Sequence, residues 1–237
     1  SCRPNSIGCA GPVAHPRRPR AATAETQCCN VAGSTRDRIL QTCLTLFNEH
    51  GLAAVSTHKI AAELGISPGN LHYHFKTKEQ IVSWLVRRFE SKSDALNDAQ
   101  AAIAAVDDLW LALHLRFEAI AEYRFVYRDV AYLSSEYPAV GQRAQLMTAR
   151  NLVAAQALFE HLAAAGVVQA SAEQARILAL QTVFTTTCWL TFEQLMPGRA
   201  RDSSPGLAAF YTLTLISPYV SPESRAYLDY MRSKYLG

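Results

Sequence analysis

Residues 56–78 read STHKIAAELGISPGNLHYHFKTK, and this stretch decides how the rest of the sequence is interpreted. Ser56 stands at an N-cap position, a short apolar face follows, and Gly65 ends the first helix. Ser67 and Pro68 then start a second helix of about two turns, because a hydroxyl N-cap followed by proline is a strong start signal. The spacing predicts a helix-turn-helix.

The second of these helices has an unusual outer face. Only Leu71 and Phe75 are apolar enough to anchor it, and they are four residues apart, on one side of a helix. The side chains left to face outward are Asn70, His72, Tyr73 and His74. These groups suit contacts with phosphates and base edges, whereas a merely solvated helix more often carries Glu and Lys.

His72 and His74 also raise the question of a metal site. Residues two apart on a helix point about 200° away from each other, so these two imidazoles cannot chelate one ion. The six cysteines include no Cys-x-x-Cys pair, and four of them precede residue 30. We therefore expect no metal, no other cofactor and no disulfide framework.

Helical signals continue on both sides of this stretch. Apolar residues spaced as on one helix face predict a helix from Ser34 to Gly51. Thr77 caps a further helix, with Gln80 completing a capping box, and this helix continues toward Asp94 or beyond. Further helices are predicted at 107–123, 125–134, 139–165, 172–196, 206–219 and 222–235.

One run argues against a helix. Residues 183–187, VFTTT, are β-branched and aromatic, which favours a strand. They lie inside 172–196, which contains no Gly or Pro and is too long for one strand. No strand-turn-strand pattern occurs elsewhere, so the predicted fold class is all-α.

Three segments follow from this pattern. Residues 1–33 lack any apolar period and are expected to form a disordered tail. Residues 34–80 are expected to form a three-helix, helix-turn-helix DNA-binding domain. A connector helix then leads into residues 81–237, which are expected to form a second, all-helical domain.

Composition excludes several classes of protein. With 49% hydrophobic residues in 237, the chain can bury a sizeable core. No run approaches the roughly 18 to 20 apolar residues of a membrane span, and no secretory signal is visible, so we expect a cytoplasmic protein. Residues 1–95 hold 12 Lys and Arg against 7 Asp and Glu, a net +5, which is compatible with a nucleic-acid-binding front.

Residues 56–81 resemble the DNA-binding domain of the TetR family of bacterial transcriptional regulators. The family's helix 2 pattern, Thr-x-x-x-Ile-Ala, corresponds to residues 56–61, STHKIA, and its Leu-Tyr-x-His-Phe motif corresponds to 71–75, LHYHF. One residue departs from the pattern: His72 stands where the family usually has a phosphate-binding Tyr. A neutral imidazole can still donate one hydrogen bond to phosphate, in a weaker and pH-sensitive contact.

The resemblance implies roles for individual residues. Those expected at the DNA groove are Thr57, His58, Gly69, Asn70 and Tyr73. Those expected on phosphates are His72, His74 and Lys78. For residues 81–237 it implies a ligand-binding and dimerisation domain. The partners that it implies are a double-stranded DNA operator, a second copy of the chain bound through 172–196 and 206–219, and a small organic effector.

A ligand pocket is inferred from residue type and position. Large or polar groups on otherwise apolar central helices are Trp110, His114, Phe117, Tyr127, Arg128 and Trp189. The competing interpretation is that the aromatic residues are simply core and that Arg128 pairs with Glu122 or Asp129. His114 is the most suggestive, since its helix is apolar nearly all round.

The expected function is a TetR-type regulator, a ligand-released repressor that binds a palindromic operator as a homodimer. The alternative is an effector-independent DNA-binding regulator or an activator. An enzyme is not expected, because the sequence has no Gly-x-Ser-x-Gly, His-Glu-x-x-His, P-loop or Gly-rich dinucleotide motif.

Overall fold

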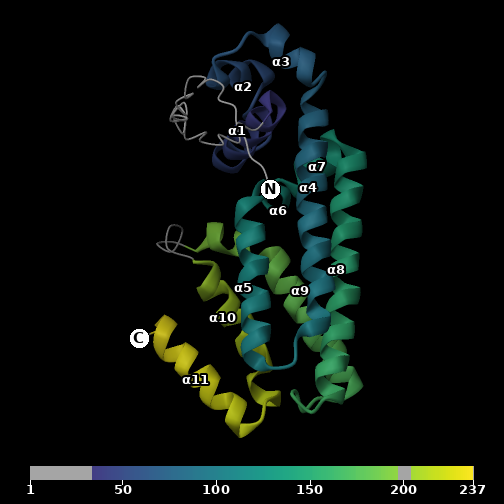
Figure 1. Cartoon of the computed structure of the whole chain (residues 1–237), viewed down its shortest axis with the longest axis vertical. Helices are drawn as coiled ribbons and strands as arrows, with labels where there is room; N and C mark the ends of the chain where they lie inside the picture. Colours follow the sequence, from purple (N-terminus) through teal and green to yellow (C-terminus); the bar gives the residue numbers. More distant parts are fainter. Residues whose placement is uncertain (1–33, 197–203, 237) are drawn as a thin grey trace, which may run out of the picture. The chain divides into compact units, whose positions relative to one another are not determined.

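All regular structure in the described part of the chain is helical, which confirms the predicted all-α fold. The computed structural model describes residues 34–196 and 204–236, so the predicted tail, 1–33, lies outside it. No helix in these ranges is long and apolar enough to cross a membrane. The α-helices in Figure 1 are α1 (Thr35–His50), α2 (Thr57–Leu64), α3 (Pro68–His74), α4 (Lys78–Asp98), α5 (Val106–Glu122), α6 (Phe125–Arg128), α7 (Val130–Glu136), α8 (Pro138–Ala164), α9 (Ala172–Leu195), α10 (Pro205–Leu213) and α11 (Pro222–Leu236).

Hydroxyl side chains start α2, α3 and α4, as the sequence predicts. Ser56, Ser67 and Thr77 each accept a hydrogen bond at 3.2 Å from the backbone N–H three residues on. Such caps satisfy donors that a helix cannot pair internally. The capping box predicted at Thr77 differs in its second half, because Gln80 Oε1 accepts from Lys76 N–H at 2.9 Å, one residue before the cap.

The β-branched run in α9 is helical because its packing overrides its propensity. Val183 and Thr186, three residues apart, both face the core. The Thr186 hydroxyl donates to the carbonyl oxygens of Thr182 and Val183, each at 3.0 Å, so its burial leaves no unpaired donor.

Two predicted helices are wrong in their continuity. The helix predicted at 125–134 is divided into α6 and α7 at Asp129, whose φ of −104° and ψ of 25° leave the helical region. Its carboxylate accepts a hydrogen bond from Leu52 N–H at 2.8 Å, a tertiary contact that the local sequence does not reveal. The helix predicted at 206–219 ends at Leu213 and continues as the 3-10 helix Thr214–Tyr219, which contains Pro218.

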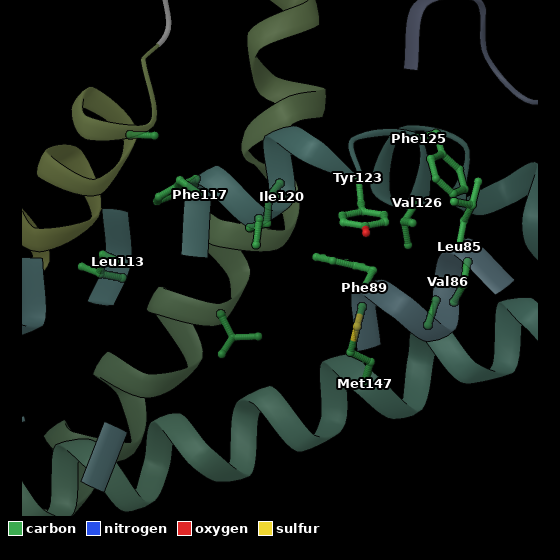
Figure 2. Close-up of a cluster of buried hydrophobic side chains, with 14 of the residues drawn as sticks. Leu85, Val86, Phe89, Leu113, Phe117, Ile120, Tyr123, Phe125, Val126 and Met147 are labelled. Carbon is green, nitrogen blue, oxygen red and sulfur yellow. The ribbon is translucent and has the colours of Figure 1, made fainter. Parts of the chain in front are cut away.

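Long helices surround one continuous core. Helix α8 packs against α4 and α9, while α5 packs against α4 and α10 (Figure 1). Figure 2 shows Phe89 of α4 between Tyr123, at the end of α5, and Met147 of α8. The Phe89 and Tyr123 rings stack with centroids 5.2 Å apart. This packing joins the connector helix α4 to the helices that follow it.

Candidate functional site

A tight turn holds α2 and α3 together. Gly65 adopts the left-handed conformation, with φ 65° and ψ 30°, which a residue with a Cβ resists. Gly65 N–H donates to the Ala62 carbonyl at 3.1 Å and Ile66 N–H donates to the Ala61 carbonyl at 3.0 Å. These two bonds close the end of α2, so α3 begins directly afterwards with Ser67 as its cap.

Helix α3 is anchored on one side and open on the other. Leu71 and Phe75 are buried, as predicted, whereas the Tyr73 side chain is 77% exposed. Its ring meets the His74 ring edge-on with centroids 5.2 Å apart. Of the other residues predicted to bind DNA, Gly69, Asn70 and His72 on α3 and Thr57 and His58 on α2 are exposed, and His74 is half-buried. The structure thus brings these six side chains and Gly69 onto two adjoining helices that contact each other.

Lys78 does not share this exposed face. Its ammonium donates a hydrogen bond to the Leu52 carbonyl oxygen and lies 5.9 Å from the Phe47 ring centroid and 5.6 Å from that of Tyr132. Burial lowers the pKa of Lys78, and the nearby Asp129 carboxylate opposes that shift. In this structure the ammonium thus faces Leu52 and the two rings, and the phosphate contact that the resemblance implies for Lys78 stays a prediction.

Two exposed cations near α3 are not among the residues predicted from the sequence to bind DNA. Lys76 is exposed directly after Phe75. The Arg36 guanidinium lies over the Phe75 and Trp84 rings, at 4.8 and 4.5 Å from their centroids. The signal for Lys76 is its position beside the aromatic anchor, whereas only the fold brings Arg36 to that ring.

Residues of α6 hold the end of α1. Arg128 donates through Nη2 to the Phe47 carbonyl at 2.5 Å and through Nη1 to the Asn48 carbonyl at 2.7 Å. Arg128 Nε also donates to Asp129 Oδ1 at 3.2 Å, while Asp129 Oδ2 accepts from Leu52 N–H. We call these five residues the α1–α6 contact. Arg128 thus binds backbone, although it also lines a small surface cleft with Leu190 and Glu193.

Asp129→Ala is expected to lower the free energy of unfolding by about 1–3 kcal/mol, because it leaves Arg128 Nε and the Leu52 N–H without their acceptor. The measurements are denaturant unfolding and amide hydrogen exchange, in which the Leu52 amide should exchange faster. Asp229→Ala, on the exposed side of α11, is the matched control. Equal stability of both variants would contradict a structural role for the α1–α6 contact.

Most of the predicted ligand-binding residues pack elsewhere. Trp110 and His114 stack with centroids 5.1 Å apart, and His114 Nε2 lies 3.3 Å from Glu118 Oε1. Phe117 is buried against Trp189, with centroids 5.9 Å apart. None of these four lines the internal cavity described next, whereas Tyr127 does.

A cavity of about 40 Å³ lies between α4, α5, α6, α8 and α9. Its apolar lining is Leu96, Leu109, Ala112, Leu113, Ala155, Leu158, Phe159 and Val183, and its polar lining is Gln100, Arg116, Tyr127, Asn151, Thr182 and Thr186. Burial raises the pKa of Tyr127 to about 12, so its hydroxyl stays protonated, although Arg116 opposes the shift. The mixed lining is of the kind found in small-molecule sites.

Arg116 forms the polar end of this cavity, and we call it and its three partners the Arg116 cluster. Its Nη2 donates to Asn97 Oδ1 at 2.6 Å, and its Nη1 donates to Ser93 Oγ at 2.8 Å and to Asn151 Oδ1 at 3.4 Å. Burial lowers the pKa of Arg116. Arg116 is not among the residues predicted from the sequence to bind a ligand, because His114, with its apolar neighbours, is the more conspicuous polar residue on the same helix.

Exposed apolar side chains lie on α9. Ile177, Leu180 and Phe184 are all exposed, at helical spacing. In contrast, α10 turns Ala208, Ala209, Phe210 and Leu213 into the core of its own chain against α5. The structure thus leaves 206–219 with less exposed apolar surface than α9, and the part that each segment plays in a dimer stays a prediction.

Two family models together match most of the sequence. A model described as bacterial regulatory proteins of the tetR family matches residues 39–85, and one described as a bacterial transcriptional repressor, TetR, matches residues 88–228. The HTH-type transcriptional repressor KstR2 of Mycolicibacterium smegmatis is 35% identical over 117 residues, 44% of this chain and 54% of that protein. The chain thus spans about half the length of the curated relatives that it matches first.

Solved structures extend the likeness over more of the chain. A TetR-family transcriptional regulator from Marinobacter aquaeolei VT8 is 33% identical with a TM-score of 0.77, over 86% of this chain and 99% of the other. AibR, solved in complex with isovaleryl coenzyme A and operator DNA, is 15% identical with a TM-score of 0.60, over 78% of this chain and 98% of the other. At that identity AibR shares the fold alone.

Proposed function

Because the chain belongs to the TetR family of bacterial transcriptional regulators, we propose that it represses transcription by binding a palindromic operator as a homodimer, and that a small organic ligand releases it. The observation that carries the proposal is the outer face of α3. Leu71 and Phe75 fix this short helix in the core, while Asn70, His72 and Tyr73 remain exposed. A helix held in this way can enter a major groove without unfolding any part of the domain.

The internal cavity favours a ligand-responsive regulator over an effector-independent one. A cavity lined by both apolar groups and polar groups such as Arg116 and Tyr127 is typical of a small-molecule site, whereas an effector-independent regulator needs no such cavity. AibR, which shares this fold, binds both isovaleryl coenzyme A and operator DNA in its solved complex and is a precedent for a ligand-responsive regulator. Whether the protein represses or activates depends on where the operator lies relative to the promoter, and repression is the reading that we propose.

Helix α6 offers a path from the cavity to the DNA-binding helices. It is only four residues long, Phe125–Arg128. Tyr127 lines the cavity, and the next residue, Arg128, binds the backbone at the end of α1. A ligand that binds one position of Tyr127 better than another therefore also biases the α1–α6 contact.

The prediction of a palindromic operator is tested by selecting the fragments that the purified protein binds from a pool of random duplexes. We expect inverted half-sites about one helical turn apart, since a two-fold dimer mirrors the symmetry of its site. Selection of no symmetric sequence would remove the proposal.

Tyr73→Ala tests the role of α3 within that site. We expect a loss of about 1–3 kcal/mol on the selected operator and little change on random duplexes, because a residue at a base edge contributes to specific binding only. The measurement is fluorescence anisotropy on both duplexes at one salt concentration. Tyr73→Phe keeps the ring and separates its contribution from that of the hydroxyl. Equal losses of Tyr73→Ala on both duplexes would refute a base contact.

A further inference from the structure

The Arg116 guanidinium is a partly buried cation whose hydrogen-bond partners are all neutral. Ser93, Asn97 and Asn151 supply hydroxyl and amide oxygens, and among residues 34–196 and 204–236 no carboxylate lies within ion-pair distance of it. Removing a charge from water is costly, and neutral hydrogen bonds offset the cost only in part. An anion that reached this position would regain much of that energy.

We propose that the cavity binds a small molecule with one carboxylate and an apolar body, and that the carboxylate binds Arg116; its effect on DNA binding rests on the function proposed above. The planar guanidinium presents paired N–H donors that match the two oxygens of a carboxylate. Arg116 is the one charged residue among the described residues that line the cavity, so a monoanion balances it. A phosphate dianion would bring a second charge with no partner.

The rest of the lining fits the other parts of such a ligand. Leu109, Leu113, Phe159 and Val183 offer an apolar surface for a hydrocarbon body. The Tyr127 hydroxyl, protonated because burial raises its pKa to about 12, can donate to a carboxylate oxygen. Gln100 carries a buried side-chain oxygen, Oε1, with no hydrogen-bond partner in the described structure, which leaves an acceptor for a hydroxyl group on the ligand.

The size of the cavity links binding to a change of conformation. A volume of about 40 Å³ holds only a few water molecules, so a hydrocarbon body needs more room. Tyr127 also lines a groove of about 360 Å³ between α6, α7, α8 and α9, together with Val130, Thr148 and Cys188. A ligand whose carboxylate lies on Arg116 can therefore extend past Tyr127 toward this groove.

The Arg116 cluster connects such binding to α4. Ser93 and Asn97 both belong to α4, the helix that begins directly after the DNA-binding helices. The three hydrogen bonds of the cluster use three of the five N–H donors of Arg116, so donors remain for a carboxylate. A carboxylate that draws the guanidinium toward itself changes its bonds to Ser93 and Asn97, and that difference can shift the position of α4.

The probes are straight-chain carboxylates from butanoate to dodecanoate, each paired with the primary alcohol of equal length. Binding to the full chain is measured by the shift in melting temperature and by calorimetry. We expect one range of chain lengths to bind as the carboxylate and the matched alcohols to bind at least 10-fold more weakly, since a hydrogen-bonded ion pair exceeds a neutral contact by about that factor. Equal binding of acids and alcohols would overturn the proposal.

The variant Arg116→Gln tests whether Arg116 is the residue that binds the carboxylate. We expect about a 10- to 100-fold loss of carboxylate affinity with alcohol binding unchanged, whereas Arg232→Gln, on the exposed side of α11, should behave as the parent. Undiminished affinity in a folded Arg116→Gln variant would overturn the assignment. If that variant does not fold, the comparison of acids with alcohols in the parent still decides.

Operator binding separates this inference from the proposed function. A parent protein that selects an operator but binds no carboxylate of the series refutes the inference and leaves the function standing. A protein that binds carboxylates through Arg116 but selects no operator refutes the proposed function and leaves carboxylate binding standing. If the protein both selects an operator and binds carboxylates, the carboxylates that bind should lower its operator affinity, and Arg116→Gln should abolish that response.

Discussion

Leu180→Glu combined with Phe184→Glu is expected to convert a dimer into a monomer and to weaken operator binding by about 10²- to 10⁴-fold. Both side chains lie exposed on α9, 57% for Leu180 and 66% for Phe184, and Ile177 extends the same face. A contiguous apolar face of this kind indicates an interaction surface. Carboxylates placed opposite each other across a two-fold axis would be buried without a partner.

Light scattering during gel filtration measures the oligomeric state, and anisotropy measures affinity for the complete operator and for a single half-site. The variant should lose affinity for the complete operator only, since each α3 is unaltered. Leu111→Glu on α5, where Leu111 is 50% exposed, is the matched control and should remain dimeric. A monomeric parent, or a variant that stays dimeric, would rule out α9 as the interface.

Phe89→Ala is expected to destabilise the protein by about 3–5 kcal/mol, because it removes a fully buried ring and leaves a cavity. Phe89 stacks on Tyr123 and meets the Tyr127 ring edge-on with centroids 5.8 Å apart, so α4, α5 and α6 all lose contacts. For a chain of this size, that loss corresponds to a fall in melting temperature of roughly 6–20 °C.

Thermal and urea unfolding followed by circular dichroism provide the measurement. Tyr230→Ala, which also removes an aromatic ring but from a side chain that is 61% exposed, should change stability by less than about 0.5 kcal/mol. A similar small effect of Phe89→Ala would mean that the packing of α4 on α5 contributes little to stability.

Local signals in the sequence were sufficient to predict the helices around the DNA-binding face. The Ser56, Ser67 and Thr77 caps and the left-handed Gly65 depend on bonds within a few residues, and all four occur in the structure. Leu71 and Phe75 are buried because both repeat on one side of α3. Periodicity and capping are local properties, so one sequence can reveal them.

Tertiary contacts account for the differences between the structure and the predictions made from the sequence. Lys78 turns toward the carbonyl of Leu52, and Asp129 breaks a helix while accepting from Leu52 N–H. Leu52, the partner in both contacts, is distant in sequence from Lys78 and from Asp129. Nothing in the composition of 125–134 marks the break in the helix. The apolar residues of 206–219 predict a buried face equally well for a dimer and for the chain's own core, and the structure buries them against α5.

The sequence by itself determined the all-α fold, the helix-turn-helix and the outer residues of α3, because each depends on the order of residues along one short segment. Only the tertiary structure decided which polar residue lies at the internal cavity. Trp110 and His114 are as conspicuous on α5 as Arg116, yet Arg116 is the one that meets Ser93 and Asn97 of α4 and Asn151 of α8. The sequence of a helix gives the residues on all of its faces, but which face is buried depends on the helices that pack around it.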